Sequence, residues 1–189
     1  MRETRFNPKI SAAIRAKDLP GLQSLLEAEP EQVTAFTPFA GGTWLHYAAR
    51  EGDVDAVCYF LSLGIDANVG DAREGRSPLC DACLGDHPHI VRLLLKSGGS
   101  IDTTEAVRNP LFAAIVGRSP ASVTLLLDHG VDTTVAYNGP RMKQMDAVAF
   151  ALEQGEREIA QTIAQQGSPV DVEGRLNEAG RIAALNNVR

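Results

Sequence analysis

The chain contains few of the residues from which disulfide frameworks and metal centres are built. Its 189 residues include three cysteines and four histidines, and aromatic residues make up 5% of the total. A small, odd number of cysteines argues against a disulfide framework and fits a reducing compartment. The sequence has no run of about eighteen apolar residues that would span a bilayer. It also has no signal-peptide pattern at its start. These absences predict a cytoplasmic protein with no membrane partner, and the length fits one domain.

Basic residues are outnumbered by acidic ones, 18 to 24, which gives a formal net charge of −6. No basic cluster with interleaved aromatic residues is present, so nucleic-acid binding has little support. The acidic excess lies within residues 38–167, and most of it within residues 38–107, which hold ten acidic and five basic residues. A field of this sign repels nucleic acid and favours a basic partner. The alternative is the ordinary acidic surface of a soluble protein.

What the chain does contain is a spaced series of glycines, each preceded by a pair of apolar residues. The glycines are Gly64, Gly98, Gly130 and, after a weaker pair, Gly167, at intervals of 34, 32 and 37 residues. A period in this range indicates a stacked repeat. Binding, and not catalysis, is therefore the first expectation about function.

Each repeat also contains a helix-start motif upstream of its glycine, beginning at Thr43, Ser77, Asn109 or Asp146. These residue types cap helices because their side chains accept hydrogen bonds from the free N–H groups of the first turn. A short helix with small residues follows, then a turn, then a second helix with apolar residues at i, i+3 and i+4. The closing glycine fits the left-handed position after a helix. Each unit is therefore expected to be helix, turn, helix and extended loop.

The segment from Thr43 to Asn68 resembles a nearly complete ankyrin repeat. It has the Thr-x-Leu-His start, two alanines, a second apolar helix, and an ending similar to the Gly-Ala-Asp-Val-Asn of that family. Further copies run from Ser77 to Asp102 and from Asn109 to Asp132, and Asp146 to Gly167 is a degenerate fourth copy. The resemblance implies an all-α ankyrin-repeat solenoid with an N-terminal capping repeat and a short C-terminal helix or tail. The expected parts are an ankyrin-repeat domain over 1–167 (cap 5–37; repeats about 38–70, 71–104, 105–135 and 141–167) and a tail over 168–189 that could form a capping helix.

Two cysteines and two histidines form the one arrangement that suggests a metal. Cys80 and Cys83 have the C-x-x-C spacing of structural zinc sites, and His87 and His89 follow them. However, both cysteines fall at repeat positions of a first helix, and His87 falls where ankyrin repeats usually carry a structural histidine. A redox C-x-x-C would need a βαβ context that is absent. We therefore expect no metal and no cofactor.

His46 ends the Thr-x-Leu-His motif, where the histidine of the family joins its helix start and loop by hydrogen bonds. A catalytic role would need a nucleophile and an orienting acid, and the sequence offers no independent sign of either. The chain is therefore not expected to be an enzyme. Cys58 is expected in the apolar stripe of a second helix.

The resemblance also implies where a partner binds, because ankyrin proteins usually contact partners through loop tips and the exposed side of first helices. Tyr, Trp and Arg are frequent binding anchors, and Trp44 replaces the usual proline of the motif. The long loop from Val135 to Met145 adds candidates beside an Asn138-Gly139 turn signal. The alternative is that these are ordinary solvated residues. The predicted contact residues are Phe39, Trp44, Tyr47, Arg50, Glu51, Arg73, Glu74, Arg76, Asp81, Glu105, Arg108, Tyr137 and Arg141.

The segments Asn109–Ile115 and Met145–Ala151 resemble those of short bacterial ankyrin proteins found beside contact-delivered toxins. The resemblance implies an immunity protein that binds and inhibits a cognate toxin, with the acidic first repeats complementing a basic, nuclease-like domain. The alternative is a general ankyrin scaffold or regulator with a non-toxin protein partner. A monomer is expected in either case.

Overall fold

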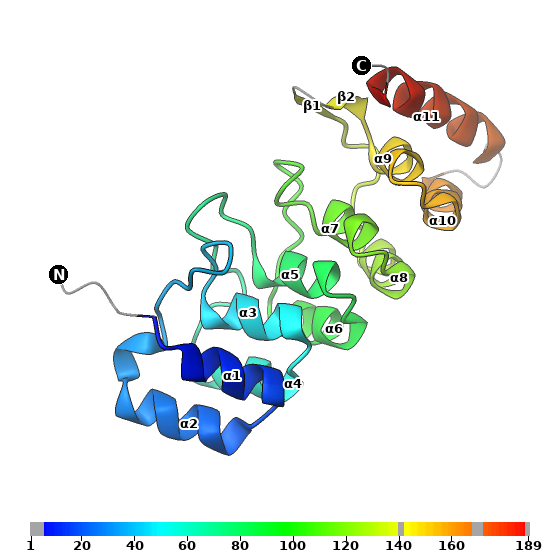
Figure 1. Cartoon of the computed structure of the whole chain (residues 1–189). Coiled ribbons are helices and arrows are strands. Elements are labelled where there is room, and N and C mark those ends of the chain that lie inside the picture. Colours follow the sequence, from blue (N-terminus) through cyan, green and yellow to red (C-terminus); the bar gives the residue numbers. More distant parts are fainter. Residues whose placement is uncertain (1–5, 140–141, 168–171, 188–189) are drawn as a thin grey trace. The chain divides into compact units, whose positions relative to one another are not determined.

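The computed structural model describes residues 6–139, 142–167 and 172–187, and most of these residues are helical, as predicted (Figure 1). The elements in chain order are α1 (Pro8–Ala16), α2 (Leu19–Ala28), the 3-10 helix η1 (Pro30–Gln32), α3 (Trp44–Glu51), α4 (Val54–Ser62), α5 (Pro78–Leu84), α6 (Pro88–Lys96), α7 (Pro110–Val116), α8 (Pro120–Asp128), β1 (Tyr137–Gly139), β2 (Met142–Met145), α9 (Ala147–Glu153), α10 (Arg157–Gly167) and α11 (Val172–Asn187).

The four predicted capping residues each precede a first helix. Thr43, Ser77, Asn109 and Asp146 are the N-cap residues of α3, α5, α7 and α9. The Asp146 carboxylate accepts a hydrogen bond from the backbone N–H of Ala149 at 2.8 Å. Such bonds satisfy N–H groups that the helix itself leaves without a partner. The predicted helix starts are therefore confirmed.

The turns between the paired helices require a left-handed backbone. The turn residues Gly52, Asp86, Arg118 and Gly155 all have positive φ, between 53° and 81°. The closing glycines at 64, 98 and 130 also have positive φ, which glycine adopts without steric cost. Gly167 departs from the pattern, because it is the last residue of α10.

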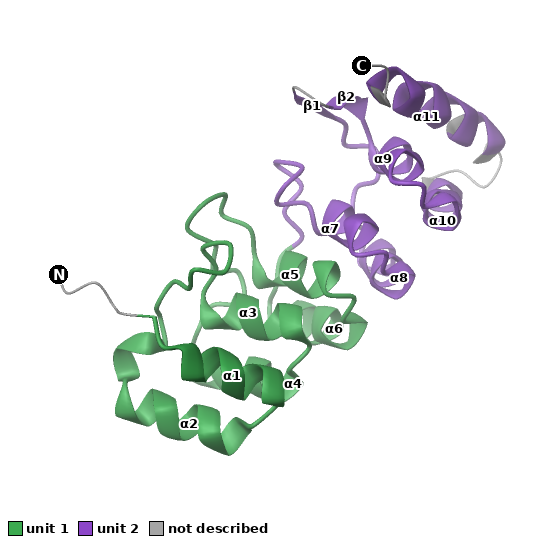
Figure 2. Cartoon of the chain, viewed as in Figure 1, with its two compact units in different colours: residues 1–100 green, residues 101–189 purple. Residues whose placement is uncertain are grey.

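The chain divides into two compact units, residues 1–100 and 101–189 (Figure 2). In unit 1, α3 lies between α1 and α5 and packs against both, and α2, α4 and α6 are the second helices of the three pairs. Leu45, Phe60, Leu79 and Leu94 are among the fully buried side chains between these layers. Burying one such side chain contributes about 1.5–3 kcal/mol, so this apolar strip is the main source of stability in unit 1.

In unit 2, α7 and α8 form one pair, α9 and α10 form the next, and α11 packs against α9. Ala179 and Ala183 of α11 are buried. The Asn186 side chain accepts a hydrogen bond from Lys143 N–H at 2.8 Å and donates one to Lys143 O at 3.1 Å. Residues 172–187 therefore form a C-terminal helix, and Asn186 bonds this helix to β2.

Two expectations about local structure are wrong. Asn138 and Gly139 belong to β1, which pairs with β2 in an antiparallel hairpin, so they are not the turn itself. Cys58 is exposed, because the buried face of α4 is formed by Ala56, Val57 and Phe60. Among the described helices, none combines the length and the apolar composition that a membrane-spanning segment needs.

Candidate functional site

A cavity of about 460 Å³ opens in unit 1 between the loop before α3, the exposed side of α3, and α5. Six of the thirteen predicted contact residues line it, so the structure brings together positions that are far apart in the sequence. This cavity is termed the unit 1 pocket below. Its lining residues are Phe39, Ala40, His46, Tyr47, Arg50, Glu51, Arg76 and Asp81.

A buried carboxylate shared by two arginines forms the polar floor of the unit 1 pocket. Arg50 Nη1 lies 3.2 Å from Asp81 Oδ1, and Arg76 Nη2 lies 3.8 Å from the same oxygen. The Asp81 side chain is 6% exposed and that of Arg50 is 49% exposed. Burial raises the pKa of Asp81, and this rise is opposed by the nearby positive charge of Arg76 and by His46 and Arg50. The floor thus combines a desolvated acid with two cations, the half-exposed Arg50 and the enclosed Arg76.

Asp71 fixes the loop that carries Arg76 into the pocket. Its Oδ1 accepts backbone N–H groups of Arg73, Glu74 and Gly75 at 2.9, 2.7 and 3.2 Å, and its Oδ2 lies 3.5 Å from Arg76 Nε. Burial alone would raise the pKa of Asp71, but the donors from Glu74 and Arg73 and the charge of Arg76 outweigh it and lower the pKa. Arg76 is therefore held by two carboxylates and by a preformed turn.

His46 lines the pocket and joins two successive repeats. The Thr43 N–H donates to His46 Nδ1 at 3.1 Å, and His46 Nε2 lies 2.8 Å from the backbone O of Arg76. This pattern assigns the neutral ring with its proton on Nε2, and burial lowers the pKa of His46. The predicted hydrogen-bonding role is confirmed, although the loop that His46 holds belongs to the next repeat.

The rings of Phe39 and Tyr47 form an aromatic wall of the pocket. Phe39 stacks on Tyr47 with ring centroids 4.6 Å apart, and Phe39 is 41% exposed. Trp44 stacks under Phe6 at 5.7 Å and contacts Tyr47 edge-on at 6.0 Å. Trp44 is 1% exposed, so it is a core residue, and its expected place on the surface is wrong. Tyr47 and Asp81 are also buried, contrary to expectation, although both still line the cavity.

The remaining predicted residues lie outside the pocket. Arg73 and Glu74 are exposed on the loop held by Asp71. In unit 2, Glu105 and Arg108 form an ion pair at 3.7 Å. Arg141 lies outside the described residues.

Tyr137 uses its side chain within unit 2. Its hydroxyl donates to Thr103 O at 2.7 Å and accepts from Asn109 Nδ2 at 3.0 Å, and its ring packs edge-on against Phe112 at 5.0 Å. The ring is half-buried. Tyr137 therefore anchors the hairpin to the loop before α7.

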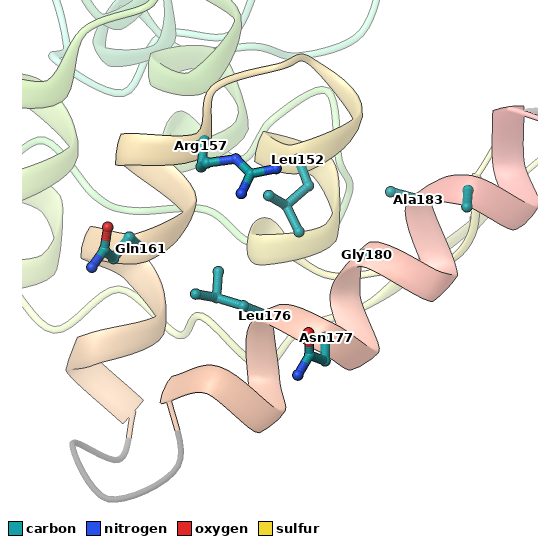
Figure 3. A pocket seen from close by; sticks show the side chains of 8 residues that line it. Leu152, Arg157, Gln161, Leu176, Asn177, Gly180 and Ala183 are labelled. Carbon is teal, nitrogen blue, oxygen red and sulfur yellow. The ribbon is translucent and has the colours of Figure 1, made fainter.

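Some residues that line the two cavities were not predicted from the sequence. Ala40 and His46 line the unit 1 pocket but were not among the predicted contacts, although the Thr-x-Leu-His motif marks the position of His46. A second cavity, of about 540 Å³, lies in unit 2 beside α11, and Leu152 and Leu176 point into it from opposite sides (Figure 3). Its lining comprises Leu152, Arg157, Gln161, Leu176, Asn177, Gly180, Ala183 and Ala184, none of which was predicted.

The cysteines of the C-x-x-C motif lie in the core of unit 1. Cys80 and Cys83 are fully buried, and burial raises the pKa of Cys80 to about 12 and that of Cys83 well above its ordinary value. Metal binding requires thiolates, which this environment disfavours. His87 Nε2 lies 3.0 Å from Arg50 O, which accounts for that ring. Within the described residues, no group of three or more His, Cys, Asp or Glu could hold a metal ion.

Comparison with known proteins gives one family. The family model described as ankyrin repeats (3 copies) matches residues 10–105 and 45–136. A probable E3 ubiquitin-protein ligase, XBOS32, from Oryza sativa subsp. japonica is 28% identical over 125 residues, which are 64% of this chain and 25% of that protein.

Two shorter matches have a higher sequence identity to this chain than XBOS32 has. Protein fem-1 homolog C of Xenopus laevis is 50% identical over 46 residues, 24% of this chain and 7% of that protein. The B-cell lymphoma 3 protein homolog of Mus musculus is 36% identical over 64 residues, 34% of this chain and 14% of that protein. The chain thus spans a quarter or less of the length of these relatives.

Proposed function

The chain belongs to the ankyrin-repeat family, and from this premise we propose that it binds its protein partner at the unit 1 pocket. Ankyrin repeats are interaction modules and generally not enzymes. The observation that supports this site is the gathering of six predicted contact residues around one cavity. Phe39, Arg50 and Glu51 are exposed at its rim, where a partner can reach them.

The partner we propose is a basic toxin domain, which the chain inhibits in the cytoplasm as an immunity protein. Two observations support this choice: the excess of acidic residues within 38–107, and the resemblance of two segments to bacterial immunity proteins. Charge complementarity of this kind accelerates encounter and discriminates against wrong partners. Binding as a monomer would block the active site of the toxin.

The test is co-expression of the chain with the product of the neighbouring gene. If the proposal is right, that product alone arrests growth, and the chain restores growth by forming a complex. A product that is harmless, or toxicity that the chain does not relieve, would leave a scaffold or regulator with a non-toxin partner as the function.

The site is tested separately by two substitutions at the rim, Phe39→Ala and Glu51→Lys. Each should weaken the complex by at least about tenfold, because Phe39→Ala removes an exposed aromatic anchor and Glu51→Lys places a positive charge where a basic partner is proposed to bind. Phe36→Ala and Glu27→Lys are the matched controls, because Phe36 and Glu27 are exposed and lie outside the pocket lining. Equal effects of rim and control substitutions would place the partner elsewhere.

A further inference from the structure

We propose that the unit 1 pocket receives an arginine side chain of the partner, which replaces Arg50 at the Asp81 carboxylate. This inference rests on the proposed function, because it concerns the same site, and it names the group that the site recognises. Four observations lead to it: an internal guanidinium at the carboxylate, an open carboxylate oxygen, an exposed aromatic wall, and the Glu51 carboxylate at the rim.

Arg50 shows that a guanidinium fits against Asp81 at this position. Its Nη1 lies 3.2 Å from Asp81 Oδ1, while half of its side chain remains in solvent. An arginine with an exposed stem can leave such a pair at little cost, because water replaces the lost contact. The buried Asp81 is less able to lose this contact, since only Arg76, 3.8 Å from the same oxygen, would then remain beside a buried charge. If another guanidinium takes the place of Arg50, Arg50 returns to water and Asp81 keeps a cation at the same position.

Asp81 also has capacity for a better partner than Arg50. The contacts from Arg50 and Arg76 both end on Oδ1, and Oδ2 receives no hydrogen bond from the described side chains or backbone. A guanidinium prefers to bind a carboxylate with two parallel N–H donors, one to each oxygen. A partner arginine that enters from the cavity can use both oxygens, whereas Arg50 uses one.

The aromatic wall selects arginine over lysine. Phe39 lies stacked on Tyr47, and its ring is substantially exposed beside the cavity. The planar guanidinium stacks on aromatic rings while it donates in its own plane, which an ammonium cannot do. Glu51, exposed on the same turn of α3 as Arg50, adds negative charge at the entrance.

An anionic ligand fits the same pocket less well. Arg76 is enclosed and already lies near two carboxylates, Asp71 and Asp81. A carboxylate or phosphate that reached Arg50 would stand beside Asp81 and Glu51, and like charges in close contact are unfavourable. The charge arrangement therefore favours a cationic guest.

The probe for this inference is N-acetyl-arginine methylamide, titrated into the full chain and followed by NMR. We expect saturable shifts at Phe39, Tyr47 and Glu51 at millimolar concentration. The citrulline derivative, which has the same shape without the charge, should bind about tenfold more weakly, since charge-assisted hydrogen bonds are the stronger ones. The lysine derivative should fall between them. Equal binding of arginine and citrulline, or preference for N-acetyl-aspartate, would overturn the inference.

Replacement of Arg50, which competes with the probe for the Asp81 carboxylate, gives a second, independent test. Arg50→Gln should tighten binding of the arginine probe several-fold, because Asp81 no longer has to release its own guanidinium. Arg92→Gln, an exposed site on α6 with the same charge change, is the control and should have no such effect. Asp81→Asn should abolish the preference for arginine over citrulline if the variant folds. Weaker or unchanged probe binding by Arg50→Gln overturns the inference even if the Asp81 variant does not fold.

The two proposals fail in different ways. If the probe does not bind but Phe39→Ala and Glu51→Lys still weaken the partner complex, the proposed function stands and the arginine inference falls. If the probe binds as expected but those substitutions leave the partner complex intact, the partner uses another surface, and both proposals are overturned.

Discussion

Burial separates the aromatic residues around the unit 1 pocket into two functional groups. Trp44 is enclosed by Phe6 and Tyr47, whereas Phe39 covers Tyr47 from the solvent side. We therefore predict that Trp44→Ala lowers the free energy of unfolding by about 3–5 kcal/mol, as removal of a fully buried large side chain does. Phe39→Ala should cost much less stability. Urea unfolding of the two variants tests this, and an equal loss in both would contradict the assigned burial.

His46 gives a prediction about pH. Burial lowers its pKa in the folded chain below the usual 6.5, so the unfolded chain binds more protons in the window below 6.5. The contribution of His46 to stability is complete above pH 6.5 and is lost as pH falls below it, at up to about 1.4 kcal/mol per pH unit. The pKa of His89 is also lowered, by burial and by the nearby His87. The stability contribution of His89 is therefore also lost as pH falls.

The measurement is unfolding free energy between pH 8 and pH 5.5, a range that includes the usual pKa of 6.5 at which the unfolded chain gains the His46 proton. His46→Gln keeps a donor toward Arg76 O but has no titrating ring, so its stability should fall less steeply with decreasing pH. Identical slopes in the parent chain and the variant would mean that His46 is not buried neutral in the folded state.

The sequence predicted His46 and mispredicted Trp44 for the same physical reason. The repeat motif specifies what a residue does within its own helix pair, and the hydrogen bonds of His46 are part of that motif. The surroundings of Trp44 include Phe6, which lies before α1 in the expected N-terminal cap and outside the repeat motif. A repeat pattern carries no information about such a contact, so it could not show that Trp44 is covered.

At the level of elements, the helix pairs were predictable because their starts and turns depend on local chemistry. Capping side chains and left-handed turn residues act within a few positions of themselves. The hairpin was not predictable in this way. Its register pairs Tyr137 with Met145, and Tyr137 is fixed by Thr103 and Asn109, which lie far away in the sequence.

The anchoring of the hairpin by Tyr137 is directly testable. Tyr137→Phe removes the hydroxyl that bonds Thr103 O and the buried Asn109 side chain, so we expect a loss of about 1–3 kcal/mol in unfolding free energy. Backbone amides of β1 and β2 should also exchange faster with solvent. Tyr59→Phe is the matched control, because the Tyr59 hydroxyl makes no hydrogen bond to the described residues. Equal stability of the two variants would show that the hydroxyl bonds do not hold the hairpin.

At the scale of the whole molecule, the acidic excess is best tested through residues that the structure places on the surface. Asp81 is unsuitable, because a lysine there would lie buried beside Arg50 and Arg76. Glu51 and Glu74 are exposed on the first two full repeats. These carboxylates would attract a basic partner electrostatically during its approach.

The final prediction concerns the rate at which the proposed partner associates. The rate should fall as salt is raised, because the Debye length shortens to about 10 Å at 0.1 M. At low salt, Glu51→Lys with Glu74→Lys should slow association several-fold more than Glu27→Lys with Glu31→Lys, which changes the net charge equally on another part of unit 1. The difference should shrink as salt screens it. Stopped-flow or surface-based kinetics can measure both pairs, and a rate indifferent to salt and to either pair would remove electrostatic steering from the mechanism while leaving the pocket itself in place.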